Sequence, residues 1–279
     1  MIIRCWGARG SIPVSGEAYL KYGGDTTCLE IRTKDDDIVI VDAGSGIRRL
    51  GISLISEERY RFAMLFTHAH WDHLMGFPFF KPIYYRDTHI SMFGCPFVQT
   101  SVKEMIARVM APPNFPVNYE DIRADISYHE SCQTEFTVKS ILVTSIALSH
   151  PNQGMGYKFV EDGKSFVFLT DNELTYKHPG GLDYEDYLRF SADADLLIHD
   201  AEYNAQEYKK QRTWGHSVYK DALRLAMKAN VKKFGLFHHN QERSDSAIDE
   251  MVEDCRRIIR EHQSPLECFA LNQQTEIFL

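Results

Sequence analysis

The residues that could do chemistry in this sequence are concentrated in one short tract, residues 67–73, which reads THAHWDH. The tract holds the imidazoles of His68, His70 and His73 together with the carboxylate of Asp72. Nitrogen and oxygen ligands at this density suit a borderline metal ion such as zinc. In a tight turn the first two histidines can face one metal, while Asp72 and His73 are suited to a second. We therefore interpret the tract as a two-metal site rather than a surface histidine cluster.

Other side chains that can bind metal follow short apolar runs. Runs of about four to six apolar or β-branched residues bounded by polar ones are typical of buried strands. If these strands end at one edge of their sheets, the polar residues that follow them meet in space. The residues in question are Asp42, His68, His150, Asp171, His199, Asp200 and His238. Since side chains alternate along an extended chain, only one of the adjacent residues His238 and His239 can point cleanly into the site; we prefer His238 and keep His239 as the alternative.

The segments between these strands include two amphipathic helices. Apolar residues recur on one helical face in residues 218–229, with Ser217 placed to cap the first turn. A second apolar stripe lies in residues 248–259, in a segment that opens with acidic residues and closes with arginines, as the helix dipole prefers. Strands flanked by helices predict a layered α/β architecture. A dinucleotide-binding fold is disfavoured because no GxGxxG fingerprint is present.

Length and composition favour one continuous domain spanning residues 1–279. The chain has 44% apolar and 25% charged residues and no long linker, low-complexity tract or internal repeat. Its formal net charge of −8 argues against an extended nucleic-acid surface, which needs a basic field. The sequence contains neither an apolar run long enough to cross a membrane nor a signal peptide. We therefore expect a cytoplasmic protein without membrane contact.

The cysteines are scattered and form no CxxC pair, so we expect buried thiols in a reducing compartment rather than a disulfide framework. They are Cys5, Cys28, Cys95, Cys132, Cys255 and Cys268.

The motif HxHxDH after a strand resembles the signature of the metallo-β-lactamase superfamily. His150 in LSHPNQG resembles the third motif of that family, Asp171 in FLTDNE the fourth and His238 in GLFHHN the fifth. Asp42 in IVIVDAG resembles the first motif, a carboxylate that orients a ligand histidine. The resemblance extends almost end to end and implies an α/β fold, an αββα four-layer sandwich with its site at one edge.

The same resemblance implies a ligand set for two divalent metal ions. It assigns His68, His70 and His150 to metal 1. It assigns Asp72, His73 and His238 to metal 2, with Asp171 bridging the two. Zinc is the preferred metal, but the set lacks cysteine and includes an aspartate at the bridging position, so manganese and iron remain alternatives.

Two further motifs resemble the tRNase Z and cyclic-nucleotide phosphodiesterase branch of this superfamily. They are IHDAE at residues 198–202 and GHS at residues 215–217. In that branch the GHS histidine contacts phosphate and can protonate the leaving oxygen, and the acidic residue of the other motif holds it. The match here is His216 with Asp200 behind it, a departure because the family often has glutamate. With Asp72, these two residues form the expected catalytic set.

The glycine-rich N-terminal loops resemble loops of the same branch more weakly. Glycine lets backbone approach a phosphate closely, and Arg9 could pair with one. We treat Arg9, Ser11 and Thr26 as candidate pocket residues, with tight turns around the first strands as the structural alternative.

The leading functional hypothesis is a phosphodiesterase that acts on small phosphodiesters such as cyclic nucleotides. A tRNase Z-like ribonuclease is the first alternative, and a thioester or lactam hydrolase of the same fold is the second, although those branches lack the GHS and HDAE features. A flavodiiron-like redox role is disfavoured because His70 stands where that group usually has glutamate. A purely metal-binding role is disfavoured because every ligand position is filled. A homodimer is an option because dimers occur in this branch.

The interval between His150 and Asp171 bears on the ribonuclease alternative. Bacterial tRNase Z relatives grip tRNA with a long flexible arm inserted between the third and fourth motifs. Here only residues 151–170 intervene, and two apolar runs joined by Asp162-Gly163 predict a β-hairpin there. No room remains for an arm, so we expect a small substrate.

Overall fold

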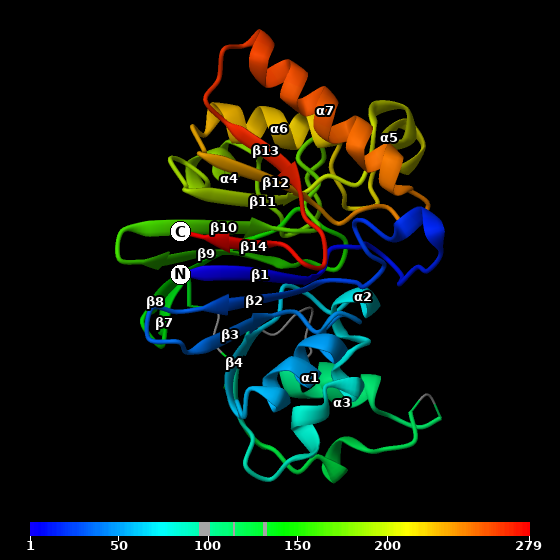
Figure 1. Ribbon diagram of the computed structural model, residues 1–279, viewed down its shortest axis with the longest axis vertical. Coiled ribbons are helices and arrows are strands. Elements are labelled where there is room, and N and C mark those ends of the chain that lie inside the picture. The colour runs from blue at the N-terminus through cyan, green and yellow to red at the C-terminus, as the bar shows by residue number, and fades with distance from the viewer. Residues whose placement is uncertain (95–100, 114, 131–132) are drawn as a thin grey trace.

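Two β-sheets packed face to face form the centre of the molecule in the computed structural model, which describes residues 1–94, 101–113, 115–130 and 133–279 (Figure 1). The strand order of the first sheet is β14 (Glu276–Phe278), β1 (Ile2–Gly7), β2 (Cys28–Arg32), β3 (Ile38–Val41), β4 (Arg61–Leu65), β5 (His89–Gly94) and β6 (Asp125–Glu130). The order of the second is β13 (Glu267–Ala270), β12 (Lys233–Phe237), β11 (Leu196–Asp200), β10 (Lys164–Leu169), β9 (Met155–Glu161), β8 (Ile141–Ala147) and β7 (Glu135–Val138).

Each sheet contains a run of parallel strands, from β3 to β6 in the first and from β10 to β13 in the second. Parallel strands place their carboxyl ends at a common edge, where the residues that follow them can meet. The predicted convergence of strand ends thus has a physical basis in the topology.

Helices cover the outer face of each sheet, so the layers follow the order helix, sheet, sheet, helix (Figure 1). The first sheet carries α1 (Ile47–Ser56) and α3 (Val102–Val109), and the second carries α4 (Tyr184–Phe190), α6 (Tyr219–Lys228) and α7 (Asp245–Glu261). The short helices of the connections are α2 (Trp71–Leu74), α5 (Ala205–Gln211), η1 (Glu17–Tyr19), η2 (Phe77–Phe79), η3 (Lys81–Tyr84) and η4 (Tyr119–Asp121). The predicted αββα sandwich is confirmed.

Three apolar layers hold the sandwich together. The central layer lies between the sheets and contains Val41 and Leu65 from the first sheet and Phe168 and Phe237 from the second. The outer layers lie between each sheet and its helices. Because both faces of the parallel strands are covered, strands such as β3 and β11 are buried along their whole length. This explains why β3 is a continuous apolar run and why β11 begins as one, without alternation.

Both predicted helices are present, but the cap assigned to the first is wrong. The N-cap of α6 is Val218, without a side-chain hydrogen bond. The Ser217 hydroxyl instead donates to the Asn172 carbonyl at 2.5 Å and accepts from the Leu174 amide at 3.1 Å. It therefore ties the start of α6 to the segment that follows Asp171. The second predicted helix is α7, whose N-cap is Ser244.

The predicted hairpin between His150 and Asp171 is confirmed. Strands β9 and β10 are antiparallel, with Glu161 opposite Lys164. The two turn residues, Asp162 and Gly163, have φ values of 49° and 75°. Positive φ at both central positions is the geometry of a type I′ turn, whose twist matches the flanking strands.

Four cysteines, Cys5, Cys28, Cys255 and Cys268, are free and buried, as predicted. Cys95 and Cys132 lie outside the described residues. Among the described residues, no helix has the length and apolar character needed to cross a membrane.

Truncation of a side chain in the central layer should lower the free energy of unfolding strongly. Phe168 is fully buried and packs edge-to-face on Phe237, with ring centroids 5.3 Å apart. We expect Phe168→Ala to lower the free energy of unfolding by about 3–5 kcal/mol, because it removes buried area and leaves a cavity. Phe278→Ala, at a side chain that is 64% exposed, should change it by less than about 0.5 kcal/mol. Urea denaturation of both variants checks this, and equal losses would contradict the assigned layering.

Candidate metal centre

Sharp turns at three strand ends create the site. Asp42 follows β3, Asp171 follows β10 and His238 follows β12, with φ values of 63°, 51° and 57°. Residues other than glycine seldom adopt this left-handed conformation. Each of the three residues stands within two positions of the end of its strand, so its side chain lies at the sheet edge. The site lies beside α2 in Figure 1.

Three histidines form the first cluster. His68 and His70 come from the connection between β4 and α2, and His150 comes from the turn after β8. Nδ1 of His70 lies 3.0 Å from Nε2 of His150. The ring centroid of His68 lies 4.6 Å from that of His70 and 4.7 Å from that of His150. Three imidazoles converging in this way can hold one divalent ion.

Two carboxylates and two imidazoles form the second cluster. Nε2 of His238 lies 3.1 Å from Oδ2 of Asp72, and Nε2 of His73 lies 3.4 Å from the same oxygen. Asp171 completes the group, with Oδ2 at 3.2 Å from Nε2 of His73 and Oδ1 at 3.3 Å from Nε2 of His238. All four side chains are buried. The mixed nitrogen and oxygen donors suit a second ion.

Asp171 connects the two clusters. Its Oδ1 also lies 3.7 Å from Nε2 of His68 and 3.8 Å from Nε2 of His150. The sequence-predicted ligand residues are thus brought together, and Asp171 occupies the position between them that a bridging ligand requires.

The protonation chemistry of His68, His150 and Asp171 fits a divalent metal. Nε2 of His68 and Nε2 of His73 are buried without a hydrogen-bond partner in the described part of the chain. Burial lowers the pKa of His68 well below its ordinary value and that of His150 to about 3, which keeps both imidazoles neutral. Burial alone would raise the pKa of Asp171, but the imidazoles of His238 and His73 lower it well below its usual range. Neutral imidazole and ionised carboxylate are the forms that bind metals.

Buried groups behind the clusters orient two of the histidines. Oδ2 of Asp42 lies 2.8 Å from Nδ1 of His73, and Asp42 is itself fixed by the amide and hydroxyl of Thr67 at 2.7 and 2.6 Å. The Gly215 carbonyl lies 2.9 Å from Nδ1 of His150. Such partners fix ring orientation and direct the other nitrogen toward the metal. The role expected of Asp42 matches this geometry.

A carboxylate that the sequence reasoning missed does the same for His238. Oε2 of Glu202 lies 2.8 Å from Nδ1 of His238, and its Oε1 accepts a hydrogen bond of 2.8 Å from the side-chain amide of Asn240. Glu202 stands two residues after Asp200, and in an extended segment alternate residues point to the same side. The two-residue spacing from Asp200 is the signal in the sequence that could have identified Glu202.

His216 and Asp200 form the predicted pair. Nδ1 of His216 lies 2.7 Å from Oδ2 of Asp200 and 3.8 Å from Oδ1 of Asp171. The ring is stacked on that of His238, with centroids 4.6 Å apart. Burial would lower the pKa of His216, but the carboxylates of Glu202 and Asp200 outweigh it and raise the pKa to about 9. These two carboxylates therefore favour the protonated form of the ring.

A second missed residue, Glu173, fixes the loop that carries His216. Its carboxylate accepts hydrogen bonds from the amides of Thr213 and Gly215, each at 2.9 Å, and from the hydroxyl of Tyr208 at 2.6 Å. Glu173 is 1% exposed. The sequence carries no signal for this role, because its partners come from a distant loop.

The structure decides between the adjacent histidines. His239 lies outside the clusters: its Nε2 is 2.8 Å from the Leu271 carbonyl, and its ring packs against Tyr22 with centroids 5.5 Å apart. Burial lowers the pKa of His239 to about 3, so it is a neutral core residue. His238 is the one that reaches the site.

The expectation that Arg9 and Thr26 line the pocket is wrong. The Arg9 guanidinium is buried and donates to the carbonyls of Gly23, Asn240 and Arg243, so it ties loops together and offers nothing to a phosphate. The Thr26 hydroxyl accepts a hydrogen bond from the Ser45 amide at 2.8 Å. Ser11 does reach the site, but through its backbone amide, which donates to Oδ2 of Asp72 at 2.9 Å.

A family model described as a beta-lactamase superfamily domain matches residues 38–239. The chain belongs to the metallo-β-lactamase superfamily. The match includes both clusters and the pair formed by His216 and Asp200. The protein is therefore a hydrolase of the metallo-β-lactamase fold, a fold that binds divalent metals at such His and Asp clusters.

Several superfamily members resemble the chain over most of its length. Ribonuclease Z of Sulfurisphaera tokodaii is 26% identical over 238 residues, which cover 75% of this chain and 80% of the relative. A diphosphatase of the PhnP family superposes with a TM-score of 0.69 at 15% identity, covering 100% of this chain and 97% of that one. The short form of human tRNase Z superposes with a TM-score of 0.67 at 18% identity, covering 100% and 99%. At such identities the two solved structures show a shared fold.

The metal content of variants tests the ligand assignment. We expect His238→Ala to lower the number of divalent ions bound per chain by about one, because it removes a donor from the second cluster. Asp171→Ala should lose most of the bound metal, because its carboxylate reaches both clusters. Elemental analysis of purified protein measures this.

His239→Ala is the matched control, since it removes a buried histidine one residue away that faces the core. It should bind as much metal as the unmodified protein. Equal metal loss in His238→Ala and His239→Ala, or full metal content in Asp171→Ala, would refute the assignment.

Proposed function

We propose that this hydrolase is a phosphodiesterase that acts on small phosphodiesters such as cyclic nucleotides and uses two divalent ions, with zinc as the preferred metal. The observation that carries this proposal is the position of His216, whose Nδ1 lies 2.7 Å from Oδ2 of Asp200 and 3.8 Å from Oδ1 of Asp171. An imidazole that a carboxylate holds beside the metal clusters can donate a proton to the leaving oxygen of a phosphodiester.

In this proposal His68, His70 and His150 would hold one ion. Asp72, His73 and His238 would hold the other, and the carboxylate of Asp171 would serve both. Bound there, the ions would supply Lewis-acid activation and charge neutralisation for displacement at phosphorus. Asp42 and Glu202 keep the rings of His73 and His238 in place, so the donors are preorganised before substrate arrives.

His216 acts as the general acid. Its Nδ1 is engaged by Asp200, so we assign the proton donated to the leaving group to Nε2. Asp200 and Glu202 both favour the protonated ring, so His216 enters the reaction carrying the proton that the departing alkoxide needs. After transfer, the same carboxylates favour reprotonation from solvent.

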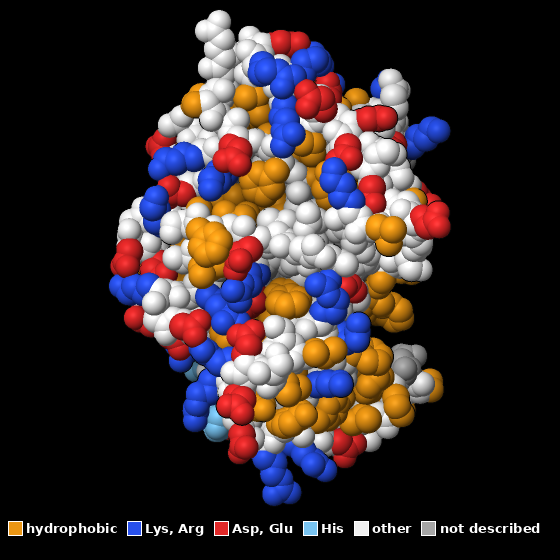
Figure 2. All heavy atoms as spheres, viewed as in Figure 1, with side chains coloured by type: hydrophobic (Ala, Val, Ile, Leu, Met, Phe, Trp, Pro, Cys, Tyr) orange, Lys and Arg blue, Asp and Glu red, His pale blue; other side chains and the backbone are white. Residues whose placement is uncertain are grey.

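A tRNase Z-like ribonuclease is the second candidate, favoured by the ribonuclease Z relative that matches three quarters of the chain. Two observations weigh against efficient processing of tRNA. The segment between His150 and Asp171 is a tight hairpin without an arm. The net charge is −8, and on the face shown in Figure 2 acidic and basic side chains are interspersed, without a continuous basic field.

Substitution of the general acid gives the sharpest test of mechanism. We expect His216→Ala to retain metal and lose turnover by about 10²–10⁴-fold on substrates with alkyl leaving groups. The loss should be much smaller for nitrophenyl esters, whose leaving groups need no proton. Steady-state kinetics on both substrate types, with His239→Ala as the control, measures this. Equal losses on the two types would show that His216 acts only through phosphate binding.

A comparison of kcat/KM between small phosphodiesters and a pre-tRNA separates the two candidate functions. We expect the metal-loaded protein to hydrolyse cyclic nucleotides or bis-p-nitrophenyl phosphate with a higher kcat/KM than it trims the 3′ end of a pre-tRNA, because no arm is available to grip the tRNA. Trimming that is faster than turnover of every small phosphodiester tested would reverse the order of the two candidates.

A further inference from the structure

Two tryptophans beside the metal centre are exposed to solvent. Trp71 is 71% exposed and Trp214 is 61% exposed. Trp71 stands between the cluster residues His70 and Asp72, and Trp214 lies two residues before His216. Large apolar side chains left in water beside a polar site are a feature of ligand-binding surfaces.

The two segments that carry the indoles both contact the side chain of His150. His70, which directly precedes Trp71, places its Nδ1 3.0 Å from Nε2 of His150. Gly215, which directly follows Trp214, places its carbonyl 2.9 Å from Nδ1 of His150. Gly215 has a φ of 95°, and a Cβ there would fall 2.1 Å from the His150 ring. The loop that carries Trp214 therefore packs against the imidazole of His150. His70, the residue before Trp71, contacts the same imidazole.

We propose that Trp71 and Trp214 form an aromatic platform at the mouth of the site that stacks on a nucleobase of the substrate. This inference rests on the proposed function and narrows the substrate to phosphodiesters that carry a nucleoside. Residues 70–72 and 214–216 border the clusters, so a base linked to a phosphate held there is the group that these indoles would meet. Every nucleobase has a π-face, so an indole platform binds bases with little discrimination among them.

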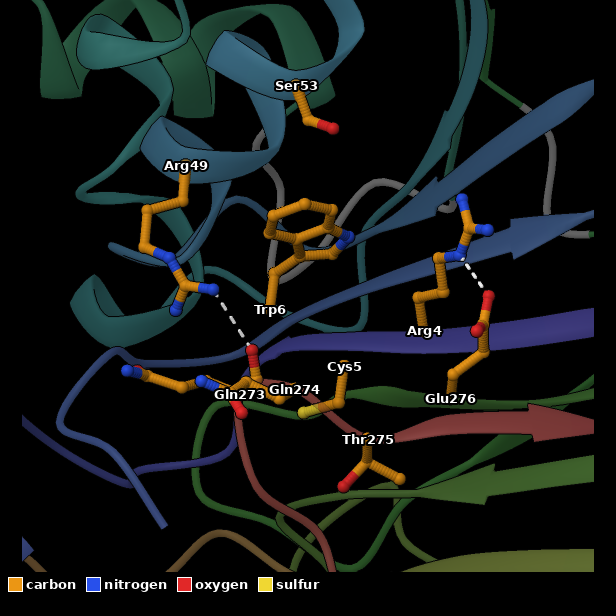
Figure 3. A pocket seen from close by; sticks show the side chains of 9 residues that line it. All are labelled: Arg4, Cys5, Trp6, Arg49, Ser53, Gln273, Gln274, Thr275 and Glu276. Atoms are coloured by element: carbon orange, nitrogen blue, oxygen red, sulfur yellow. Dashed lines mark hydrogen bonds and ion pairs between the residues drawn. The ribbon is translucent and has the colours of Figure 1, made fainter. Parts of the chain in front are cut away.

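The third tryptophan provides an internal reference. Trp6 lies in a separate pocket of about 330 Å³, where the Arg49 guanidinium lies 5.5 Å from the centroid of its ring (Figure 3). Its indole nitrogen donates to Glu30 at 2.9 Å. None of the residues that line this pocket belongs to the metal clusters. Trp6 should therefore contribute a constant fluorescence when a ligand binds at the metal centre.

Two esters with the same leaving group test the platform. Thymidine 5′-p-nitrophenyl phosphate carries a base, whereas methyl p-nitrophenyl phosphate does not. We expect Trp71→Ala and Trp214→Ala each to lower the ratio of kcat/KM for the thymidine ester over the methyl ester by roughly 10- to 100-fold, as is typical when a base-stacking aromatic is truncated. Trp71→Phe and Trp214→Phe should recover part of the ratio. Phe278→Ala, at an exposed aromatic on β14 far along the sheet, is the matched control and should leave the ratio unchanged.

Fluorescence gives a readout that needs no turnover. AMP added to the metal-loaded protein should quench tryptophan emission, and the quench should shrink in Trp71→Ala and in Trp214→Ala. If the unmodified protein hydrolyses both esters, but the ratio is the same in every variant and AMP causes no quench, the platform is wrong and the phosphodiesterase proposal stands. If neither ester is hydrolysed while AMP still quenches through these two indoles, the proposed function fails and the base-binding platform is supported.

Discussion

The structure depends on a buried negative charge at the junction of the two sheets. Asp171 is 1% exposed, and its oxygens lie within 3.8 Å of nitrogens of His68, His73, His150, His216 and His238. An isolated carboxylate at such depth would cost several kcal/mol. It is stable only when positive charge lies beside it, and the surrounding imidazoles, led by those of His238 and His73, lower its pKa. The other residues of the site keep the histidines in position around this carboxylate.

The relative positions of these side chains come from the sheet topology rather than from the loops. Asp171, Asp200 and His238 sit at or just after the ends of the adjacent parallel strands β10, β11 and β12. Their spacing is therefore fixed by the hydrogen bonds of the sheet and by the apolar layer beneath it. Left-handed turns after β10 and β12 stop the side chains at the edge. A metal centre built on strand ends has little freedom to relax, which suits donors that must be placed before the substrate binds.

The sequence predicts what is local and fails where a partner is distant. The tract from His68 to His73, the hairpin at Asp162-Gly163 and the α7 stripe depend on neighbouring residues, and the structure contains all of them. Arg9 and Ser217 looked like a phosphate ligand and a helix cap, but carbonyls from remote segments take up their donors. Glu202 shows the intermediate case, since its position in phase with Asp200 indicates a shared direction but not His238 as its partner.

Selectivity within this superfamily therefore has to arise outside the metal clusters. Their donors are constrained by the buried charge, and the same fold accommodates proteins named as ribonuclease Z and as a diphosphatase. What remains free to vary is the rim, where side chains touch solvent instead of one another. In this chain two exposed indoles lie on segments next to the clusters, and a tight hairpin occupies the interval between His150 and Asp171. Under the proposed function, exposed aromatic side chains next to the clusters and the lack of an inserted arm favour substrates that are recognised within a few bonds of the phosphate.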